Sequence, residues 1–358
     1  MNIYQAFAGR PERDGPLALA AIIETGGSTP QVPGAAALFS ERGLVAGTLG
    51  GGPLEAEAER RARSALASGR SVVFGFGLRG EALEGDEPVC GGEAVILIDA
   101  SPAVHRETFL AMRDSLRSRK RGLLATRVRP GGDAGEVAVH RSWIEEGAGT
   151  TAAVPWDGPP LKTPDLAAAL RDGLPILSRP DDDNGGASFD FLEPLAPLPR
   201  LLIAGAGHIG QALCRLAVPL GFEVTVIDDR ADFASPGRFP DADRLVVDPP
   251  GRALGSLPAD AGTYIVIVTR GHKDDTSALR ACIRSQAAYI GMIGSRGKVA
   301  LVRERFLVEG WASAAEFDRV HTPIGLPIGS RTVEEIAVSI AAELVQVRSR
   351  LSAGPRPG

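Results

Sequence analysis

Cysteine and aromatic residues are scarce in this chain of 358 amino acids, which has three cysteines and 5% aromatic residues. Cys90, Cys214 and Cys282 are too few and too scattered for a disulfide framework, and no CxxC pair indicates a zinc or dithiol redox site. The start of the chain lacks the apolar segment of a signal peptide, and apolar runs such as 264–268 are too short to cross a bilayer. We therefore expect a cytoplasmic protein without a membrane span.

An excess of positive charge is absent as well. The 39 basic and 44 acidic residues give a net charge of -5, whereas nucleic-acid binders display a basic surface, so nucleic acid is not an expected partner. The length exceeds what one hydrophobic core usually organises, which predicts at least two domains. Glycine (44) and proline (27) are abundant, and this composition is typical of a loop-rich α/β protein rather than a helical bundle.

A proline-rich connector at residues 194–199 divides the chain. We expect a separate N-terminal α+β domain at 1–193, which could itself divide into 1–100 and 101–193, and a C-terminal Rossmann-type domain at 194–358. Strands and helices alternate regularly beyond the connector, as a doubly wound parallel sheet requires. The six C-terminal strands are expected at 200–204, 223–227, 244–247, 264–268, 288–293 and 319–321.

The clearest motif is GAGHIG, which contains Gly205, Gly207 and Gly210. Glycine-rich hexamers arise by chance in such a chain, but this one follows the apolar strand LLIA and begins a helix. The first glycine would allow the tight turn, the second the approach of a pyrophosphate, and the third close packing of helix on strand. Asp228 follows about 20 residues later, at the spacing of a ribose-binding acid. The motif therefore predicts a site for a phosphate-bearing cofactor.

Other polar residues follow strands that would adjoin the glycine loop. His208 lies in the loop itself, although a solvent-exposed role at a helix start explains it equally well. The segment RGHKDD places His272, Asp274 and Asp275 after the fourth strand, where ligands sit in this architecture. These three residues are the catalytic candidates if the protein is an enzyme.

Two further segments reach the same rim. Ser295, Arg296 and Lys298 begin a helix after the fifth strand, where they could hold a phosphate or could simply cap the helix. His321 follows the sixth strand and is either a third histidine of the rim or a packed loop residue. Asp228 and Asp229 favour NAD over NADP, because a 2′-phosphate would meet like charge, while Arg230 weakens that preference.

The N-terminal part contains two glycine loops, GGSTPQVPG at 26–34 and GTLGGGPLE at 47–55. The second loop leads into a helix, so Gly50, Gly51 and Gly52 could form another anion site, with the hydroxyl of Ser28 as a donor if the loops approach each other. Tight turns alone explain these glycines equally well. Cys90 lies in a CGG segment that could expose its sulfur, whereas Cys214 and Cys282 lie on apolar helix faces and are expected in the core.

Taken together, these segments resemble the XdhC/CoxI family of accessory proteins for the maturation of xanthine dehydrogenase and related molybdenum hydroxylases. The resemblance runs through GGSTPQVPG, GTLGGGPLE and VCGG in the first part. In the second part it runs through GAGHIG, DDR, GHKDD, YIGMIGSRGK and HTPIGLPIGSRTVEEIAVSIAAEL. No single element is diagnostic, but their order and combination are specific.

The resemblance implies a chaperone that binds molybdenum cofactor, as molybdopterin or its dinucleotide form. Such a chaperone shields the cofactor while a cysteine desulfurase supplies its terminal sulfido ligand, and then passes it to an apo molybdenum hydroxylase of the xanthine dehydrogenase or CO dehydrogenase type. The resemblance also implies that Cys90 touches molybdenum. A homodimer could close the site between its two copies.

Two other functions stay open from the residues alone. One is an NAD(P)-dependent oxidoreductase in which His272 acts as acid or base and Asp274 or Asp275 orients it. The other is a regulatory nucleotide sensor that uses the glycine loop without a metal. The lack of a recognisable substrate domain after the glycine motif disfavours the oxidoreductase.

Overall fold

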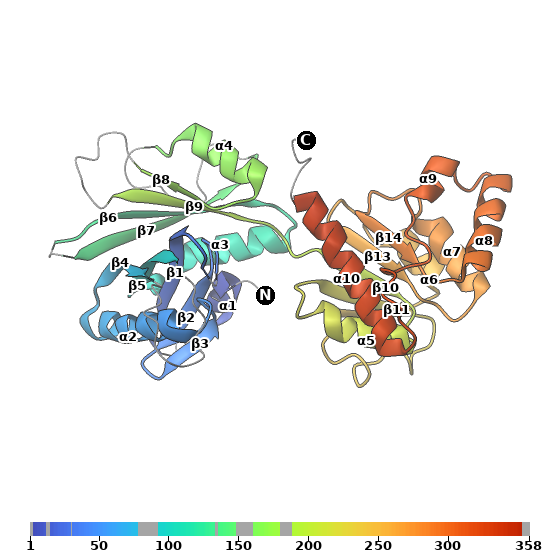
Figure 1. Cartoon of the computed structure of the whole chain (residues 1–358), viewed down its shortest axis with the longest axis horizontal. Helices are drawn as coiled ribbons and strands as arrows, with labels where there is room; N and C mark the ends of the chain where they lie inside the picture. Colours follow the sequence, from blue (N-terminus) through green and yellow to red (C-terminus); the bar gives the residue numbers. More distant parts are fainter. Residues whose placement is uncertain are drawn as a thin grey trace. The chain divides into compact units, whose positions relative to one another are not determined.

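The chain folds as two units. The computed structural model describes residues 3–11, 15–29, 31–77, 92–132, 135–147, 160–179 and 188–352, and its contacts divide the chain into Met1–Pro197 and Leu198–Gly358 (Figure 1). This division falls within the proline-rich connector. None of the helices in the described ranges is both long and apolar enough to cross a bilayer.

The N-terminal unit is built on a nine-stranded sheet with the order β3-β2-β1-β5-β4-β7-β6-β9-β8. Each neighbouring pair of strands is antiparallel, which confirms the predicted α+β class. The strands are β1 (Ala18–Gly26), β2 (Ala36–Ser40), β3 (Gly43–Gly47), β4 (Ser71–Gly77), β5 (Glu93–Asp99), β6 (Gly122–Pro130), β7 (Glu136–Glu145), β8 (Ile176–Ser178) and β9 (Phe189–Leu195). The helical segments are α1 (Ile3–Gly9), α2 (Gly52–Ser68), η2 (Pro102–His105), α3 (Arg106–Arg117) and α4 (Thr163–Asp172).

Both faces of this sheet are covered. On one face, Ile22 of β1 belongs to a core with Ala58 of α2. On the other face, Leu19 of the same strand shares a core with Leu124 of β6, because successive residues of a strand point to opposite sides. The two halves of the sheet therefore share a core, and pairing of β4 with β7 joins them as well. A division near residue 100 does not separate two independent bodies.

The C-terminal unit contains a five-stranded parallel sheet with the order β12-β11-β10-β13-β14. The first strand β10 lies between the second and the fourth, and helices cover both faces, so the predicted doubly wound Rossmann class is confirmed (Figure 1). The strands are β10 (Arg200–Ala204), β11 (Glu223–Asp228), β12 (Arg244–Val247), β13 (Thr263–Ile267) and β14 (Tyr289–Met292). The helices are α5 (His208–Ala217), α6 (Pro250–Ser256), α7 (His272–Cys282), α8 (Arg296–Val308), α9 (Ala314–Asp318) and α10 (Val333–Ser352).

The two faces of the parallel sheet have separate cores. Helices α5 and α10 pack on one face, and α6, α7, α8 and α9 contribute to the core on the other. The prediction of a sixth strand at 319–321 is wrong, because His321 forms only an isolated bridge with Gly291. Pro323 follows closely and has no N–H group with which to extend a ladder.

Candidate functional site

The loop between β10 and α5 contains the three-glycine motif. The structural reason for a glycine differs among its three positions. Gly205 has a φ of +120°, and an added Cβ would overlap with the carbonyl oxygen of Val268. A Cβ at Gly210 would overlap with the carbonyl oxygen of Gly205. Gly207 has a φ of -71°, and an added Cβ would have no atom within 4 Å. Packing among the described residues thus explains the first and third glycines but not the second.

The start of α5 presents backbone amides beside Gly207. The N–H of Gln211 donates to the carbonyl of Gly207 at 3.0 Å, which is the first hydrogen bond of helical type in α5. The N–H groups before it in the first turn have no acceptor within the helix, and the positive end of the helix dipole lies there. His208, the first residue of α5, is exposed. This turn has the geometry of an anion-binding site.

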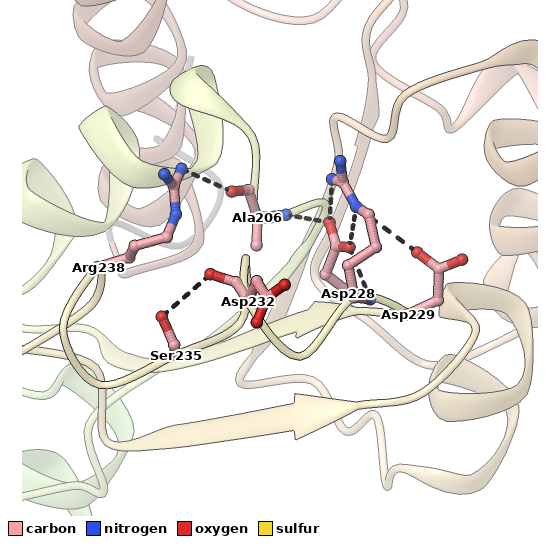
Figure 2. A network of polar contacts seen from close by, with 7 residues as sticks. Ala206, Asp228, Asp229, Asp232, Ser235 and Arg238 are labelled. Carbon is pink, nitrogen blue, oxygen red and sulfur yellow. Dashed lines mark hydrogen bonds and ion pairs between the residues drawn. The ribbon is translucent and has the colours of Figure 1, made fainter.

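The polypeptide at Ala206 is held from both sides, as Figure 2 shows. Its N–H donates to Oδ2 of Asp228 at 2.8 Å, and its carbonyl accepts a hydrogen bond from Nη2 of Arg238 at 3.2 Å. The side chain of Gln211 in turn donates to the carbonyl of Arg238 at 2.8 Å. Arg238 was not expected from the sequence, because it lies in an irregular segment without a motif. These bonds fix the glycine loop without a ligand.

Asp228 lies at the end of β11, where the ribose-binding acid is expected. Its Oδ1 accepts hydrogen bonds from N and Nε of Arg230, and its Oδ2 accepts from Nη2 of Arg230 and from Ala206. Burial raises the pKa of this carboxyl, but the hydrogen bonds from Arg230 and Ala206 outweigh that effect and lower the pKa to about 2. A carboxylate has about four acceptor positions, and these four bonds use them. Asp228 therefore positions the loop, and a ribose hydroxyl would have to displace one of these donors.

The charges beside Asp228 come from the segment after β11 and from the start of α7. The guanidinium of Arg230 stacks on Phe233, 3.5 Å from the ring centroid. Its pKa is raised by the hydrogen bond to Asp228, and also by the charges of Asp229 and Asp274. Asp274 belongs to the first turn of α7. The structure thus brings one of the two acids after β13 to the same edge as the end of β11.

Asp275 has a different environment from Asp274. Its side chain is 0% exposed, its Oδ1 accepts a hydrogen bond from the hydroxyl of Thr269, and its Oδ2 forms an ion pair with Lys298. This ion pair links the start of α7 to the start of α8. A carboxylate in this state is not available as a free acid or base, so the geometry gives Asp275 a structural role.

The remaining rim candidates are distributed as follows. The hydroxyl of Ser295 accepts from the N–H of Lys298 at 3.3 Å and caps α8, while Arg296 begins that helix and is exposed. Helix α7 begins at His272 and contains Asp274 and Asp275 in its first turn. Arg296 is therefore a cation of this rim that is accessible to an anion.

His321 is a packed residue. Its Nδ1 lies 3.0 Å from Oε1 of Glu343 on α10, and its ring centroid is 4.5 Å from that of Tyr289. Burial raises the pKa of Glu343, but hydrogen bonds from His321, Tyr289 and the backbone of Gly325 give a net lowering. This cluster connects β14 and the segment after α9 to α10, and it uses both carboxyl oxygens of Glu343.

The N-terminal motifs come together in part. A Cβ at Gly92 would overlap with the backbone of Ser28, so the end of the CGG segment lies against the GGST loop. Gly50, Gly51 and Gly52 all have positive φ values, as tight turns require. The carboxylate of Glu55 already accepts from the N–H of Leu49 at 2.9 Å and from the hydroxyl of Thr48 at 2.7 Å. An acidic side chain of the protein thus lies where the sequence suggests an external anion.

The thiols divide into two groups. Burial raises the pKa of Cys214 to about 11 and that of Cys282 to about 12, in agreement with their expected core positions. Cys90 lies outside the described residues, so its expected contact with molybdenum remains a prediction. Within the described part of the chain, no group of three or more histidine, cysteine or carboxylate side chains could hold a metal ion.

Two family models match the chain. The model described as the XdhC Rossmann domain matches residues 201–344, which include the glycine loop. The model described as the XdhC and CoxI family matches residues 12–77, which include both N-terminal glycine loops. The two models therefore fall in different structural units.

Several known proteins are similar to the chain. A protein from Bacillus subtilis, named as a probable subunit of xanthine dehydrogenase, is 27% identical over 93% of this chain and 94% of its own length. YqeB of Escherichia coli is 33% identical over 48% of this chain, but the match spans only 31% of YqeB. The molybdenum cofactor insertion chaperone PaoD of Escherichia coli is 24% identical over 42% of this chain and 41% of its own length. A crystal structure described as a xanthine dehydrogenase from Bacillus halodurans has a TM-score of 0.76 at 25% identity, covering 99% of this chain and 97% of that one.

Proposed function

We propose that this chain, which belongs to the XdhC and CoxI family, is a cytoplasmic chaperone that binds molybdenum cofactor and inserts it into a xanthine dehydrogenase-type molybdenum hydroxylase. The names of two relatives, one a probable subunit of xanthine dehydrogenase and the other a molybdenum cofactor insertion chaperone, support a role in cofactor maturation. In this proposal the chaperone shields the cofactor, supports its sulfuration by a cysteine desulfurase, and has no turnover of its own.

The observation that carries the proposal is the open face of Gly207. A side chain at this position would meet nothing in the protein, and its φ of -71° is available to any residue. A glycine here is explained if a ligand approaches the backbone, because a Cβ would then stand between the ligand and the amides of α5. The phosphate of molybdopterin, or the pyrophosphate of its dinucleotide form, has the charge that such amides bind.

The charges around the loop are compatible with this cargo. Arg230 balances the charge of Asp228, and donors from Arg230 and Ala206 occupy its carboxyl oxygens, so it does not present a free carboxylate to a phosphate. Arg296 is exposed at the start of α8 and could add a cation. The residues around the loop fit the phosphate end of the cofactor, and we assign no residue of this unit to molybdenum.

The remaining parts of the proposal concern partners. Cys90 would protect or touch molybdenum, which fits its CGG segment ending against the Ser28 loop. The partners would be an apo molybdenum hydroxylase of the xanthine dehydrogenase or CO dehydrogenase type and a cysteine desulfurase, and a homodimer would help to enclose an oxygen-sensitive cargo. NAD(P) is the ligand of the alternative oxidoreductase, but the burial of Asp275 in an ion pair removes one of that enzyme's two candidate acids.

Anaerobic purification followed by mass analysis of bound small molecules tests the proposal. The wild-type chain should retain molybdopterin or its dinucleotide, and Gly207→Val should lose it while remaining folded. Gly75→Val is a matched control, because Gly75 lies exposed in β4 and an added Cβ there also meets nothing within 4 Å. Retention by Gly207→Val equal to that of the control would refute the site. Bound NAD(P) without a pterin, together with hydride transfer in a turnover assay, would support the oxidoreductase instead.

A further inference from the structure

A pocket in the N-terminal unit is separate from the glycine loop of the Rossmann unit. It has a volume of about 550 Å³, which is typical of small-molecule sites. Gln31 and Thr48, one from each N-terminal glycine motif, line it together with Val32. Tyr4 and Glu193 also line it, although neither belongs to a motif. The two N-terminal motifs therefore meet at a cavity whose polar groups come partly from distant segments.

Glu193 supplies the acidic group of this pocket. The residue is 4% exposed, and its Oε1 accepts a hydrogen bond of 2.6 Å from the hydroxyl of Tyr4, which is 2% exposed. Among the described residues, no other side chain donates a hydrogen bond to this carboxyl. A carboxylate can accept about four hydrogen bonds, and a buried one is stable only when donors approach it. Acceptor positions of Glu193 are thus available to a ligand in the pocket.

The walls of the pocket exclude one class of ligand. The described lining residues include no lysine, arginine or histidine, and most are apolar, such as Val32, Pro33 and Leu195. A phosphate or carboxylate would therefore meet the acidic Glu193 without a compensating cation in the wall. A ligand with hydrogen-bond donors on an otherwise apolar body fits this lining.

The charge behind the pocket favours a neutral ligand over a cation. Burial raises the pKa of Glu193 to about 7, and the hydrogen bond from Tyr4 and the charge of Arg141 act in the opposite direction. Arg141 is 2% exposed and forms a buried ion pair with Asp99. This guanidinium already compensates part of the negative charge of Glu193. A neutral ligand that donates hydrogen bonds to the carboxyl is therefore favoured over a cation.

We propose that this pocket binds a planar nitrogen heterocycle through a ring N–H and the adjacent exocyclic amino group, the paired-donor edge that pterin and guanine share. The two N–H groups donate to Glu193, and apolar side chains such as Val32 and Leu195 contact the ring. The inference rests on the proposed function for the source of the heterocycle, since molybdopterin contains a pterin. It does not depend on the glycine loop, which belongs to the other unit and to which the proposed function assigns the phosphate.

A fluorescence titration of the ligand-free full chain with pterin tests this assignment, with guanosine as a competitor. Lumazine is the matched negative probe, because it carries an oxo group where pterin carries the amino group and would turn an acceptor toward Glu193. We expect pterin to bind at least about tenfold more tightly than lumazine, and Glu193→Gln to weaken pterin roughly 10- to 100-fold, as expected for loss of charge-assisted hydrogen bonds. Glu24→Gln, which alters an exposed carboxylate of β1, should bind pterin like the wild type.

The outcomes separate this assignment from the proposed function. Wild-type pterin affinity in Gly207→Val, together with loss of affinity in Glu193→Gln, supports a heterocycle site independent of the glycine loop. Displacement of pterin by guanosine supports recognition of the shared edge, and failure of guanosine to compete would contradict it. Equal binding of pterin and lumazine, wild-type affinity in Glu193→Gln, or displacement by the guanidinium compound agmatine would overturn the assignment. Tyr4→Phe, which keeps the ring and removes the donor to Glu193, should retain measurable pterin binding if the carboxyl itself is the acceptor.

Discussion

Replacement of Glu193 by glutamine should make the N-terminal unit more stable at alkaline pH. The carboxyl has a pKa of about 7 in the folded chain, against 4.5 as its ordinary value. A pKa that is raised by folding stabilises the fold below the unfolded value, and this stabilisation is lost as pH rises through the folded value. At about 1.4 kcal/mol per pH unit, the shift corresponds to about 3 kcal/mol lost between pH 4.5 and pH 7. Glutamine keeps the shape and cannot ionise, so it avoids this loss.

Urea denaturation of the wild type and Glu193→Gln at a series of pH values measures the effect. Trp143 is 1% exposed in the core of the N-terminal unit, and a Trp311→Phe background removes the signal of the other unit. We expect similar stabilities at pH 4.5 and a variant more stable by about 3 kcal/mol at pH 8. Burial lowers the pKa of His105 to about 4, but its contribution is the same in both proteins and cancels in the difference. A stability difference that does not change with pH would refute the burial of an ionisable Glu193.

Three further predictions concern the C-terminal unit. Gly205→Ala should destabilise this unit by roughly 3 kcal/mol, because Gly205 has a φ of +120° and an added Cβ would overlap with a carbonyl oxygen. Gly207→Ala should change the stability by less than about 0.5 kcal/mol. Equal effects of the two substitutions in urea denaturation would contradict this contrast. Asp275→Asn leaves its lysine partner without a counter-charge and should lower stability by roughly 2–3 kcal/mol, so an unchanged urea midpoint would count against the ion pair. Cys214 and Cys282, with pKa values raised to about 11 and 12, should resist alkylation at pH 8 in the folded chain, and rapid labelling of either residue by mass spectrometry would be the failure.

The Rossmann unit is the part of the fold that local sequence patterns predict well. In a parallel sheet covered on both faces, each strand is an apolar run followed by a helix, so the pattern repeats along the chain. Strand β10 has the bounds expected from LLIA, and the order of β10 and β13 follows from the fold class. Local pattern fails at His321, where a single bridge replaces a strand.

The N-terminal unit is less predictable because its key contacts are distant in sequence. Strand β9 contains Glu193 and Pro194, which read as polar and turn-forming, yet β9 pairs with both β6 and β8. The hydrogen bond from Tyr4 to Glu193 joins residues 189 positions apart. Helix α1, which carries Tyr4, is only seven residues long. The pocket therefore could not have been found from local patterns.

At the candidate site, the sequence predicts where residues lie better than what they bind. The spacing of Asp228 from the glycine loop predicts where the acid lies, but not what it binds. The sequence did contain a signal that Asp228 is paired within the protein. The segment DDR places Arg230 two residues later, where its guanidinium donates hydrogen bonds to the carboxylate. Arg238 carried no such signal, since its contact with Ala206 depends on how an irregular segment folds back.

The hydrogen bonds around Ala206 indicate whether the loop is suited to a phosphate or to a ribose. Asp228 and Arg238 hold the loop in place, so a ligand does not have to order it, and preorganised amides bind at a lower entropic cost. Because the acceptor positions of Asp228 are filled from within, the loop offers a ligand donors rather than acceptors at this point. A ribose needs an acceptor for its hydroxyl, whereas a phosphate needs only donors. The geometry therefore favours recognition of a phosphate over the ribose contact on which an NAD-dependent enzyme depends.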